Sequence, residues 1–274
     1  MSQSATSQYS RLFDLSGKTA LVTGGAGLLG SQFCAALAAH GARVAVVDLR
    51  QADADRVAAE IGGECVGFAC DVADPRSVAQ LVADVVSRFG AIHVLHNNAA
   101  TKSDDLEAFF APFETYALSE WRKIMAVNLD GMFLVAQAVG AQMVKQKSGG
   151  SIIHTSSIYG VVAPDQRIYE GSEYLGRAIN TPAVYAASKA GVIGLSRYLA
   201  TYWAAEGIRV NTLTPGGVES GQNETFRSRY SARVPLGRMA ERGEMVGALL
   251  YLASDASRYV TGQNLVVDGG LTCW

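Results

Sequence analysis

The sequence predicts an α/β fold, in which one doubly wound parallel sheet of about seven strands carries helices on both faces. Two observations support this prediction. Short apolar runs alternate along the chain with longer segments of helical period, which is the pattern of βαβ units. The 274 residues are also 49% hydrophobic and only 18% charged, so the chain can bury a large core.

The expected strands are short and apolar, as strands buried on both faces are. They comprise residues 18–23, 43–48, 65–70, 92–96, 151–156, 208–214 and 264–267. The expected helices comprise residues 28–40, 53–61, 75–89, 119–145, 183–206 and 238–254. Ser119 is the expected N-cap of the fourth helix. Because no change in composition marks a boundary, residues 1–274 are expected to form a single domain.

Two stretches do not follow this alternation. Residues 164–182 are polar and aromatic, and residues 216–235 are rich in Arg, Ser and Glu. Loops of this length inside a compact domain are usually functional. Both follow strands, at the carboxyl edge of the sheet where ligands bind in such folds. We therefore expect both to be loops on the substrate side, although a solvent-facing decoration is the alternative for 164–182.

Charge and composition favour a cytoplasmic protein that binds neither nucleic acid nor membrane. The formal net charge is −2, and no continuous apolar run reaches the roughly 18 residues of a membrane span. Residues 1–10 are polar and lack the apolar core of a signal peptide. The histidines and cysteines show no metal-ligand spacing, so no metal is expected. The cysteines are expected to be reduced core residues; they are Cys34, Cys65, Cys70 and Cys273.

A glycine-rich turn joins the first expected strand to the first helix. Gly25, Gly27 and Gly30 match the G-x-G-x-x-G pattern of dinucleotide-binding (Rossmann) folds. Glycines allow a tight turn and let backbone N–H groups approach a pyrophosphate at the positive end of a helix. The alternative is a turn that binds nothing.

Asp48 ends the second expected strand, where a carboxylate can accept hydrogen bonds from the ribose hydroxyls of NAD and repel the 2′-phosphate of NADP. Arg50 could weaken this preference, and Asp48 could instead cap the next helix. Asp71 and residues 97–100 follow the third and fourth strands at the same edge. NAD is therefore the expected cofactor, with NADP second.

Tyr185 and Lys189 lie one helical turn apart at the start of a long helix. An ammonium beside a phenol lowers the phenol pKa, which suits a general acid/base for alcohol and ketone interconversion. The spacing alone carries little weight, but its position near the cofactor edge carries more. Ser156 and Ser157 end the preceding strand, and at least one of them is expected to be a turn residue. Asn128, a poor helix former within a helix, is expected to tether water or backbone, unless it is simply exposed.

Together these features resemble the short-chain dehydrogenase/reductase family over nearly the whole chain. The matching positions are residues 23–30, Asp48, residues 71–72, 97–100 and 127–128, Ser157, Tyr185 with Lys189, and residues 215–216 and 260–270. The resemblance implies that Tyr185 is the acid/base and that Ser157 holds the reacting oxygen. It also implies that Lys189 lowers the tyrosine pKa and binds the nicotinamide ribose, and that Asn128 supports a proton relay.

The resemblance also implies a set of cofactor contacts and an assembly. With Tyr185 and Lys189, the expected contacts are Gly24, Gly25, Gly27, Leu28, Leu29, Gly30, Asp48, Leu49, Asp71, Val72, Asn98, Ala99, Ala100, Pro215, Gly216 and Val218. Family members commonly pair the two long helices, here residues 119–145 and 183–206, into homodimers and homotetramers.

The sequence departs from the family pattern at two places. Leu28 stands where the single-domain branch usually has the middle glycine of T-G-x-x-x-G-x-G, a spacing more similar to that of nucleotide-sugar enzymes. Ser157 and Tyr185 are 28 positions apart, about twice the usual separation. The extra segment is expected to form a wall or lid over the substrate.

Polar and aromatic residues near this segment favour a hydroxylated substrate: a sugar, a sugar acid or a polyol. The candidate contacts are Ser157, Tyr159, Tyr169, Glu170 and Tyr185. Residues 157–164 look similar to members linked to surface-sugar modification, and gluconate-type dehydrogenases are more distant. The sequence thus predicts an NAD-dependent oxidoreductase. The alternatives are an NADPH-dependent oxoacyl reductase, a nucleotide-sugar epimerase, which normally needs a larger C-terminal domain, and a nucleotide-binding module without catalysis.

Overall fold

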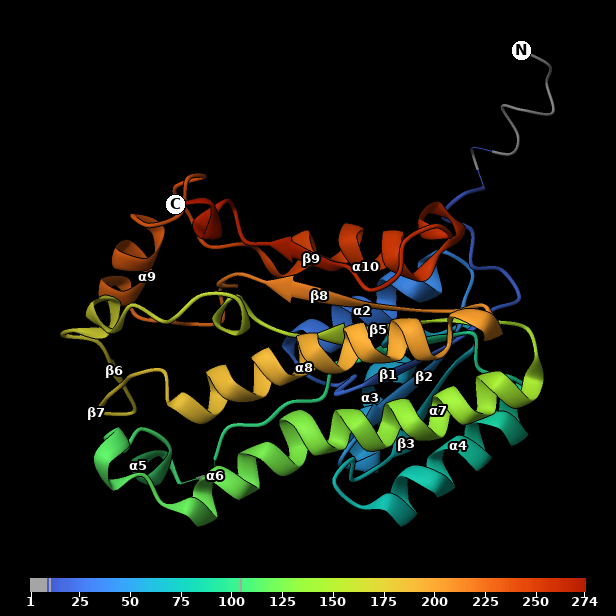
Figure 1. Cartoon of the computed structure of the whole chain (residues 1–274), viewed down its shortest axis with the longest axis horizontal. Helices are drawn as coiled ribbons and strands as arrows, with labels where there is room; N and C mark the ends of the chain where they lie inside the picture. Colours follow the sequence, from blue (N-terminus) through green and yellow to red (C-terminus); the bar gives the residue numbers. More distant parts are fainter. Residues whose placement is uncertain (1–8, 10, 104) are drawn as a thin grey trace.

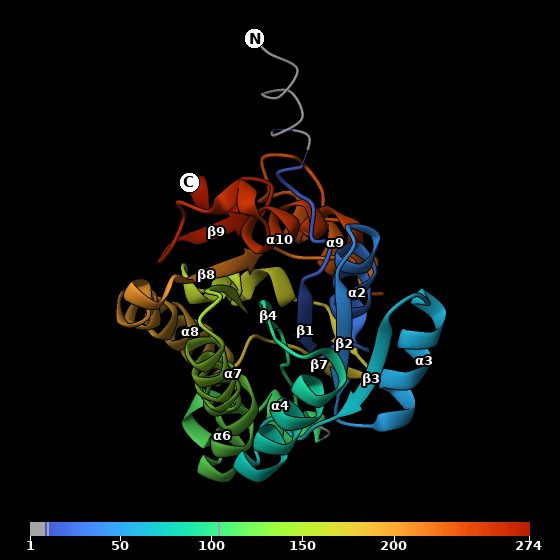
Figure 2. The same ribbon diagram turned by 90° about the vertical axis from the view of Figure 1, so that its right-hand side faces the viewer.

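The computed structural model describes residue 9 and residues 11–103 and 105–274. Most of the polar start of the chain, on which the expected absence of a signal peptide rests, lies outside the described residues. A seven-stranded parallel sheet forms the centre of the molecule, in the order β3-β2-β1-β4-β5-β8-β9 (Figures 1 and 2). Its strands are β1 (Thr19–Thr23), β2 (Arg43–Asp48), β3 (Cys65–Ala69), β4 (Val94–Asn97), β5 (Gly150–Thr155), β8 (Ile208–Pro215) and β9 (Asn264–Val267). The predicted doubly wound fold is confirmed.

Helices cover both faces of this sheet. They are α2 (Leu28–Ala39), α3 (Gln51–Ile61), α4 (Pro75–Phe89), α6 (Leu118–Met125), α7 (Met132–Gln146), α8 (Ala183–Tyr202) and α10 (Val246–Ala253). Alternate residues of β1 supply the two cores: Leu21 packs with α4, α7 and α8, whereas Ala20 and Val22 pack with α2, α3 and α10. The strand order reverses between β1 and β4, which opens a crevice at their carboxyl ends.

The helix predicted at 119–145 is longer and less regular than expected. It begins at Leu118 after the extended residue Ala117, so Ser119 lies inside the first turn and is not the N-cap. A π-helical turn, Ala126–Gly131, separates α6 from α7. Such turns insert an extra residue into the helical repeat and are frequent at functional sites.

The continuous helix Leu118–Gln146 is 29 residues long and, by length and composition, apolar enough to cross a membrane. The expectation concerned unbroken apolar runs, and this helix is not one, because polar and charged side chains interrupt it. The inner face of α7 is buried in the core of the protein itself; its buried side chains include Val135, Ala136, Val139 and Met143. Packing against the sheet thus accounts for the apolar character of this helix.

Other differences lie near the C-terminus and in the two predicted loops. Residues 238–241 are not helical, because Ala240 pairs with Val218 in an isolated bridge, and α10 follows a 3-10 turn, Arg242–Met245. The segment 216–235 contains a helix, α9 (Glu224–Ser231), capped by Asn223, whose side chain accepts from the Phe226 N–H. A short helix, α5 (Leu106–Phe109), was also not predicted.

The segment 164–182, called the insert below, folds as a 3-10 turn, Gln166–Tyr169, and a small hairpin of β6 (Glu173–Tyr174) and β7 (Arg177–Ala178). It lies between α5 and α9, next to the N-terminal end of α8 (Figure 1).

The four cysteines are free, but they are not all core residues. Cys34 and Cys70 are buried and Cys65 is half-buried, as expected. Cys273 is exposed because it lies in the last turn of the chain, Leu271–Cys273. Its assignment to the core is therefore wrong.

Candidate active site

The glycine-rich turn after β1 is held in a conformation that only small residues allow. Gly24 has φ of +63°, and the Gly25 N–H donates to the Val47 carbonyl at 2.8 Å. A Cβ on Gly30 would lie 2.0 Å from the carbonyl oxygen of Gly24. The first turn of α2 therefore packs directly on the loop, as a pyrophosphate-binding turn requires.

This turn forms one wall of a cavity of about 610 Å³ at the carboxyl edge of β1, β2 and β4. The residues that line it are Gly24, Gly27, Leu28, Leu29, Gly30, Val47, Asp48, Leu49, Cys70, Asp71, Val72, Asn98, Ala99, Ala100, Thr101 and Val127. Of the predicted contacts in the glycine turn and after β2, β3 and β4, only Gly25 is absent from this wall. A Cβ on Gly25 would lie 2.9 Å from Val46, so this glycine serves the packing of the turn on β2.

Four lining residues were not predicted: Val47, Cys70, Thr101 and Val127. Val47, Cys70 and Thr101 are each next to a predicted contact, and Val127 is next to Asn128 in the π-helical turn. Their position beside the motif residues is the feature of the sequence that could have indicated them as contacts.

The Asp48 carboxylate lies on this cavity and is hydrogen-bonded to the glycine turn. Its Oδ2 accepts from the Ala26 N–H at 3.0 Å, and its Oδ1 accepts from the Leu49 N–H at 2.8 Å. The residue at the N-cap of α3 is Arg50, and it makes no side-chain capping bond. The alternative in which Asp48 caps this helix is therefore wrong. The Arg50 side chain is 77% exposed and pairs with Asp53.

The side chains of Thr23, Asn97 and Asn98 join the ends of β1 and β4. The Thr23 hydroxyl donates to Asn97 Oδ1 at 3.2 Å and accepts from the Asn98 N–H at 2.9 Å. Asn98 Oδ1 in turn accepts from the Thr155 hydroxyl, at the end of β5. Asn97 is buried and donates to the Met132 carbonyl, so its role is structural. This network fixes the carboxyl edge on which the cavity depends.

Tyr185 and Lys189 lie on one face of α8, with the Lys189 Nζ 5.8 Å from the centre of the Tyr185 ring. Lys189 is buried, and its Nζ donates to the Thr155 carbonyl at 3.1 Å. Burial lowers the pKa of Lys189 to about 8.

Burial raises the pKa of Tyr185, a hydrogen bond from Ser157 opposes this rise, and the neighbouring Tyr169 adds to it. The expected lowering of the Tyr185 pKa by Lys189 is therefore not found. The reason is that removing the phenolate from water outweighs the other influences.

The structure distinguishes the two serines at the end of β5. The Ser156 hydroxyl donates to the Lys189 carbonyl at 2.8 Å, so Ser156 fastens the strand to α8. The Ser157 side chain is close enough to hydrogen-bond Tyr185, and its Oγ also accepts from the Tyr159 N–H. Ser157 is therefore the serine placed beside the predicted acid/base.

Asn128 is buried within the π-helical turn and clamps the backbone of Thr101. Its Oδ1 accepts from the Thr101 N–H at 2.8 Å, and its Nδ2 donates to the Thr101 carbonyl at 3.3 Å. The predicted backbone tether is confirmed, and the alternative of simple solvent exposure is wrong. Asn128 thereby positions a residue that lines the 610 Å³ cavity.

Pro215 ends β8 at the same carboxyl edge, and Gly216 and Val218 follow it, but none of the three lines the 610 Å³ cavity. Gly216 lines a separate small cavity of about 90 Å³ beside Tyr230. The Gly216 N–H donates to the Val267 carbonyl, and Val218 pairs with Ala240. This segment is thus held by β9 and by the strand-like residues before α10.

A second cavity of about 710 Å³ lies beneath the insert. Of the predicted substrate contacts, Tyr169 and Glu170 line it, whereas Ser157, Tyr159 and Tyr185 do not. The Tyr169 hydroxyl lies 3.3 Å from that of Tyr159. The predicted contacts therefore form one connected group at the edge of this cavity.

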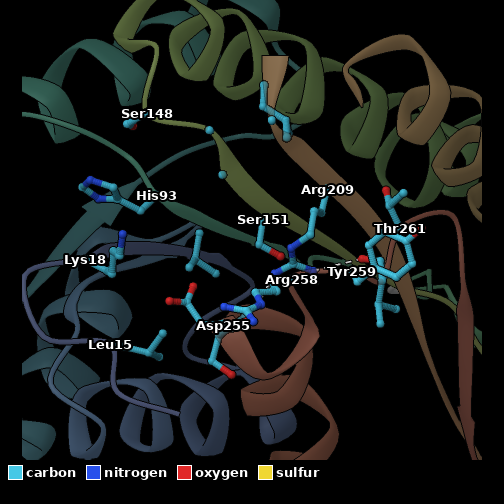
Figure 3. Close-up of a pocket in the computed structure, with 18 of the residues that line it drawn as sticks. Leu15, Lys18, His93, Ser148, Ser151, Arg209, Asp255, Arg258, Tyr259 and Thr261 are labelled. Carbon is cyan, nitrogen blue, oxygen red and sulfur yellow. Dashed lines mark hydrogen bonds between the residues drawn. The ribbon is translucent and has the colours of Figure 1, made fainter. Parts of the chain in front are cut away.

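A further cavity of about 600 Å³ lies at the opposite, amino edge of the sheet (Figure 3). Lys18, His93 and Arg209 are among the residues that line it. Arg209 is fully engaged there, since it donates to the carbonyls of Val260, Leu252 and Ser254. None of the predicted site residues lines this cavity, so the carboxyl edge is the candidate active site.

Residues 26–272 match a family model described as enoyl-(acyl carrier protein) reductase. The chain is also 40% identical to D-threitol dehydrogenase of Mycolicibacterium smegmatis, over 95% of each chain. The protein belongs to the short-chain dehydrogenase/reductase family. It is therefore an oxidoreductase that acts on hydroxyl groups and binds a nicotinamide dinucleotide.

Two solved family structures resemble the whole chain. One is a short-chain dehydrogenase from Leptospira borgpetersenii with bound NAD⁺, which is 34% identical with a TM-score of 0.84 and covers 94% of each chain. The other is a gluconate 5-dehydrogenase from Burkholderia cenocepacia in complex with NADP and tartrate, which is 33% identical with a TM-score of 0.85. It covers 96% of this chain and 98% of the relative. The family fold thus accommodates either dinucleotide.

Proposed function

We propose that this short-chain dehydrogenase/reductase interconverts a hydroxyl and a ketone on a sugar, sugar acid or polyol, with NAD(H) as the partner in hydride transfer. The convergence of Ser157, Tyr185 and Lys189 at the carboxyl edge, beside the 610 Å³ cavity, carries the proposal. The names of the two relatives that act on threitol and gluconate support a hydroxylated substrate.

The residues around the 610 Å³ cavity fit a dinucleotide. A Cβ at Gly30 would fill the space that the turn needs, and Asp48 presents a carboxylate for ribose hydroxyls. The dinucleotide supplies the hydride acceptor or donor. Asp71, Asn98 and the neighbouring wall residues would hold its adenosine and ribose groups.

The protein itself moves the proton. Ser157 orients the reacting oxygen of the substrate, and the Tyr185 hydroxyl takes up or delivers the proton at that oxygen. Burial raises the pKa of Tyr185, and oxidation of an alcohol requires that this hydroxyl first loses its proton, since only the phenolate can accept one. Lys189, with its Nζ 5.8 Å from the centre of the Tyr185 ring, would bind the nicotinamide ribose, and Asn128 holds the Thr101 backbone beside the cavity.

We further propose that NAD is preferred over NADP, because the Asp48 carboxylate would repel a 2′-phosphate and Arg50 is turned toward Asp53.

Residues 1–274 act as one unit in this proposal, with 164–182 and 216–235 as the loops on the substrate side. Pro215, Gly216 and Val218 line the nicotinamide. The four free cysteines support a reducing, cytoplasmic location.

The protein is proposed to form homodimers or homotetramers through α7 and α8. Phe133, Tyr198 and Tyr202 are exposed on these helices, and the two tyrosine rings stack with centres 5.7 Å apart. Exposed aromatic residues of this kind are typical of protein interfaces. Sedimentation analysis of the wild-type protein and of a Tyr198→Glu/Tyr202→Glu variant tests this assembly.

The proposed function is tested by titration with NADH and NADPH, followed by assays with a panel of sugars, sugar acids and polyols. The Tyr185→Phe variant should bind NADH as the wild type does but lose turnover by about 1,000-fold, since general acid/base catalysis contributes on this scale. Turnover of hydrophobic ketones alone would contradict the substrate class. Unchanged turnover in Tyr185→Phe would remove Tyr185 from the mechanism.

A further inference from the structure

Two residues in the wall of the 710 Å³ cavity beneath the insert have side-chain polar atoms that form no hydrogen bond with the described part of the protein. Tyr116 and Asn180 both line the cavity. Within the part of the chain that the structure describes, neither the Tyr116 hydroxyl nor Asn180 Oδ1 makes a hydrogen bond, and both are shielded from solvent. Buried polar atoms are normally paired, so these two call for a ligand.

The orientation of the Asn180 amide follows from its other contact. Asn180 Nδ2 donates to the Phe110 carbonyl at 2.8 Å. Because a carbonyl accepts hydrogen bonds and cannot donate them, the amide cannot be turned around. The unpaired atom is therefore the Asn180 oxygen, and its missing partner is a donor such as a hydroxyl.

Glu120 lies near Tyr116 and is also incompletely paired. Its side chain is 3% exposed; Oε2 is 3.4 Å from Lys123 Nζ, while Oε1 has no partner among the described residues. Burial, together with the Glu120 charge, raises the pKa of Tyr116 to about 12. Tyr116 thus keeps its proton and can donate to a ligand oxygen or accept from a ligand hydroxyl.

The charge around the cavity favours a neutral ligand. Glu170 and Glu173 line it, and Glu120 lies near Tyr116; Arg229, outside the wall, pairs with Glu170 at 3.5 Å, and no lysine or arginine is among the described residues that line the cavity. A carboxylate entering this cavity would meet like charges. The remaining walls are apolar and suit a carbon chain; they include Phe113, Ile179, Pro182, Ala183 and Ala186.

The cavity borders the proposed catalytic tyrosine. Ala183 and Ala186, which line it, flank Tyr185 in the first turn of α8. Tyr169, which also lines it, is close enough to raise the pKa of Tyr185. A substrate with its reacting hydroxyl at Tyr185 can therefore extend toward this cavity.

Exposed contacts hold the roof of the cavity in place. Arg177 of the hairpin pairs with Glu107 of α5 at 2.7 Å, and Lys102 lies over the Tyr174 ring at 4.3 Å. Exposed pairs of this kind contribute little to stability, so the hairpin can shift to admit a ligand to the shielded atoms.

We infer that this cavity is the subsite for the far end of a neutral polyol, in which Tyr116 and Asn180 bind its hydroxyls and Glu120, Glu170 and Glu173 disfavour sugar acids. The inference rests on the proposed function, because it takes Tyr185 as the position of the reacting hydroxyl. It narrows the substrate class from sugars, sugar acids and polyols to uncharged polyols.

The test compares threitol, its acid threonate, and 2,3-butanediol, which lacks the terminal hydroxyls. In Tyr116→Phe and Asn180→Leu, kcat/KM for threitol should fall by about tenfold, mainly through KM, while kcat/KM for butanediol stays unchanged. Tyr174→Phe, which removes a hydroxyl from the same insert outside the cavity, is the matched control and should resemble the wild type. Equal threitol kinetics in all three variants would overturn the inference.

A double variant tests whether the carboxylates of the cavity disfavour charged substrates. Glu170→Gln/Glu173→Gln should raise the ratio of threonate to threitol turnover by about tenfold, and an unchanged ratio would count against it. Turnover of threonate without turnover of threitol would overturn the inference alone, whereas the proposed function fails if the wild type oxidises none of the sugars, sugar acids and polyols. The subsite is then tested by calorimetric titration of threitol into Tyr185→Phe with NADH bound. Loss of that binding in the additional Asn180→Leu variant supports the subsite, whereas equal binding excludes it, and unchanged thermal midpoints confirm that the variants fold.

Discussion

The two cavities at the carboxyl edge differ in how their polar groups are satisfied. Around the 610 Å³ cavity, the side chains of Asp48, Asn98 and Asn128 are tied to the backbone by hydrogen bonds of 3.0, 3.2 and 2.8 Å. Around the 710 Å³ cavity, Tyr116 and Asn180 keep atoms without a partner among the described residues, and the contacts that hold the roof, such as Arg177 with Glu107, are exposed. The first is a preformed site for a ligand shared by the whole family. The second is a site in which a ligand specific to this enzyme completes the bonding.

The largest expected effect of a substitution lies in the preformed cavity. Gly30→Val would place side-chain carbon against the Gly24 carbonyl, because even a Cβ would lie 2.0 Å from that oxygen. The turn must then move, and we expect NADH affinity to fall by about 100-fold. Fluorescence titration measures this loss. Gly247→Ala in α10, where a Cβ would meet nothing within 4 Å, is the contrasting variant and should retain NADH affinity.

The Asp48→Asn variant tests whether the Asp48 charge selects NADH over NADPH. Loss of the negative charge removes the repulsion of a 2′-phosphate, while the amide oxygen can still accept from the Ala26 N–H. The ratio of NADPH to NADH affinity should rise by about tenfold, as measured by parallel titrations. An unchanged ratio would show that Asp48 does not select the cofactor.

The pH dependence of stability should report the burial of Lys189. Its pKa is about 8 in the folded protein and 10.5 when unburied, so the unfolded chain binds more protons between these values. Stability relative to Lys189→Met should therefore rise with pH from about 8, by about 1 kcal/mol per pH unit. Urea denaturation of both proteins at pH 7.5–9.5 measures the difference, which also cancels the opposing titration of the buried cysteines. A flat difference would contradict the assigned pKa.

The smallest effect is expected at the roof of the insert. Arg177→Ala removes an exposed ion pair with Glu107 and should change global stability by under about 1 kcal/mol. Its effect should appear instead in KM for the substrate, with NADH affinity unaltered. A large loss of thermal stability would mean that the roof is part of the rigid fold.

The sequence predicted the sheet, the glycine turn and the shared helix face of Tyr185 and Lys189 well, because these depend on local patterns. Apolar runs mark the strands, and Tyr185 with Lys189 follows from helical spacing. What it did not predict depends on contacts between distant segments. Tyr116 and Asn180 share a cavity only because the insert folds back over the residues that follow α5, and no local pattern records that contact.

The pKa of Tyr185 was predicted in the wrong direction for the same reason. Spacing showed that an ammonium would be near the phenol, but it could not show how deeply both would be buried. The π-helical turn at Ala126–Gly131 was also missed, since the apolar pattern continues through it. Only Asn128, a poor helix former within the predicted helix, indicated an irregularity at this position.

Two reciprocal hydrogen bonds fasten the first turns of α8 to the end of β5: Lys189 Nζ to the Thr155 carbonyl, and the Ser156 hydroxyl to the Lys189 carbonyl. They join the two ends of the chain segment that contains the insert. Strand and helix are thus locked together regardless of what the chain does between them. Insertions, deletions or exchanges of the insert can therefore alter what the enzyme accepts without displacing the groups that move the proton. This makes the segment a natural place for new specificities to evolve, and a practical one for loop grafting.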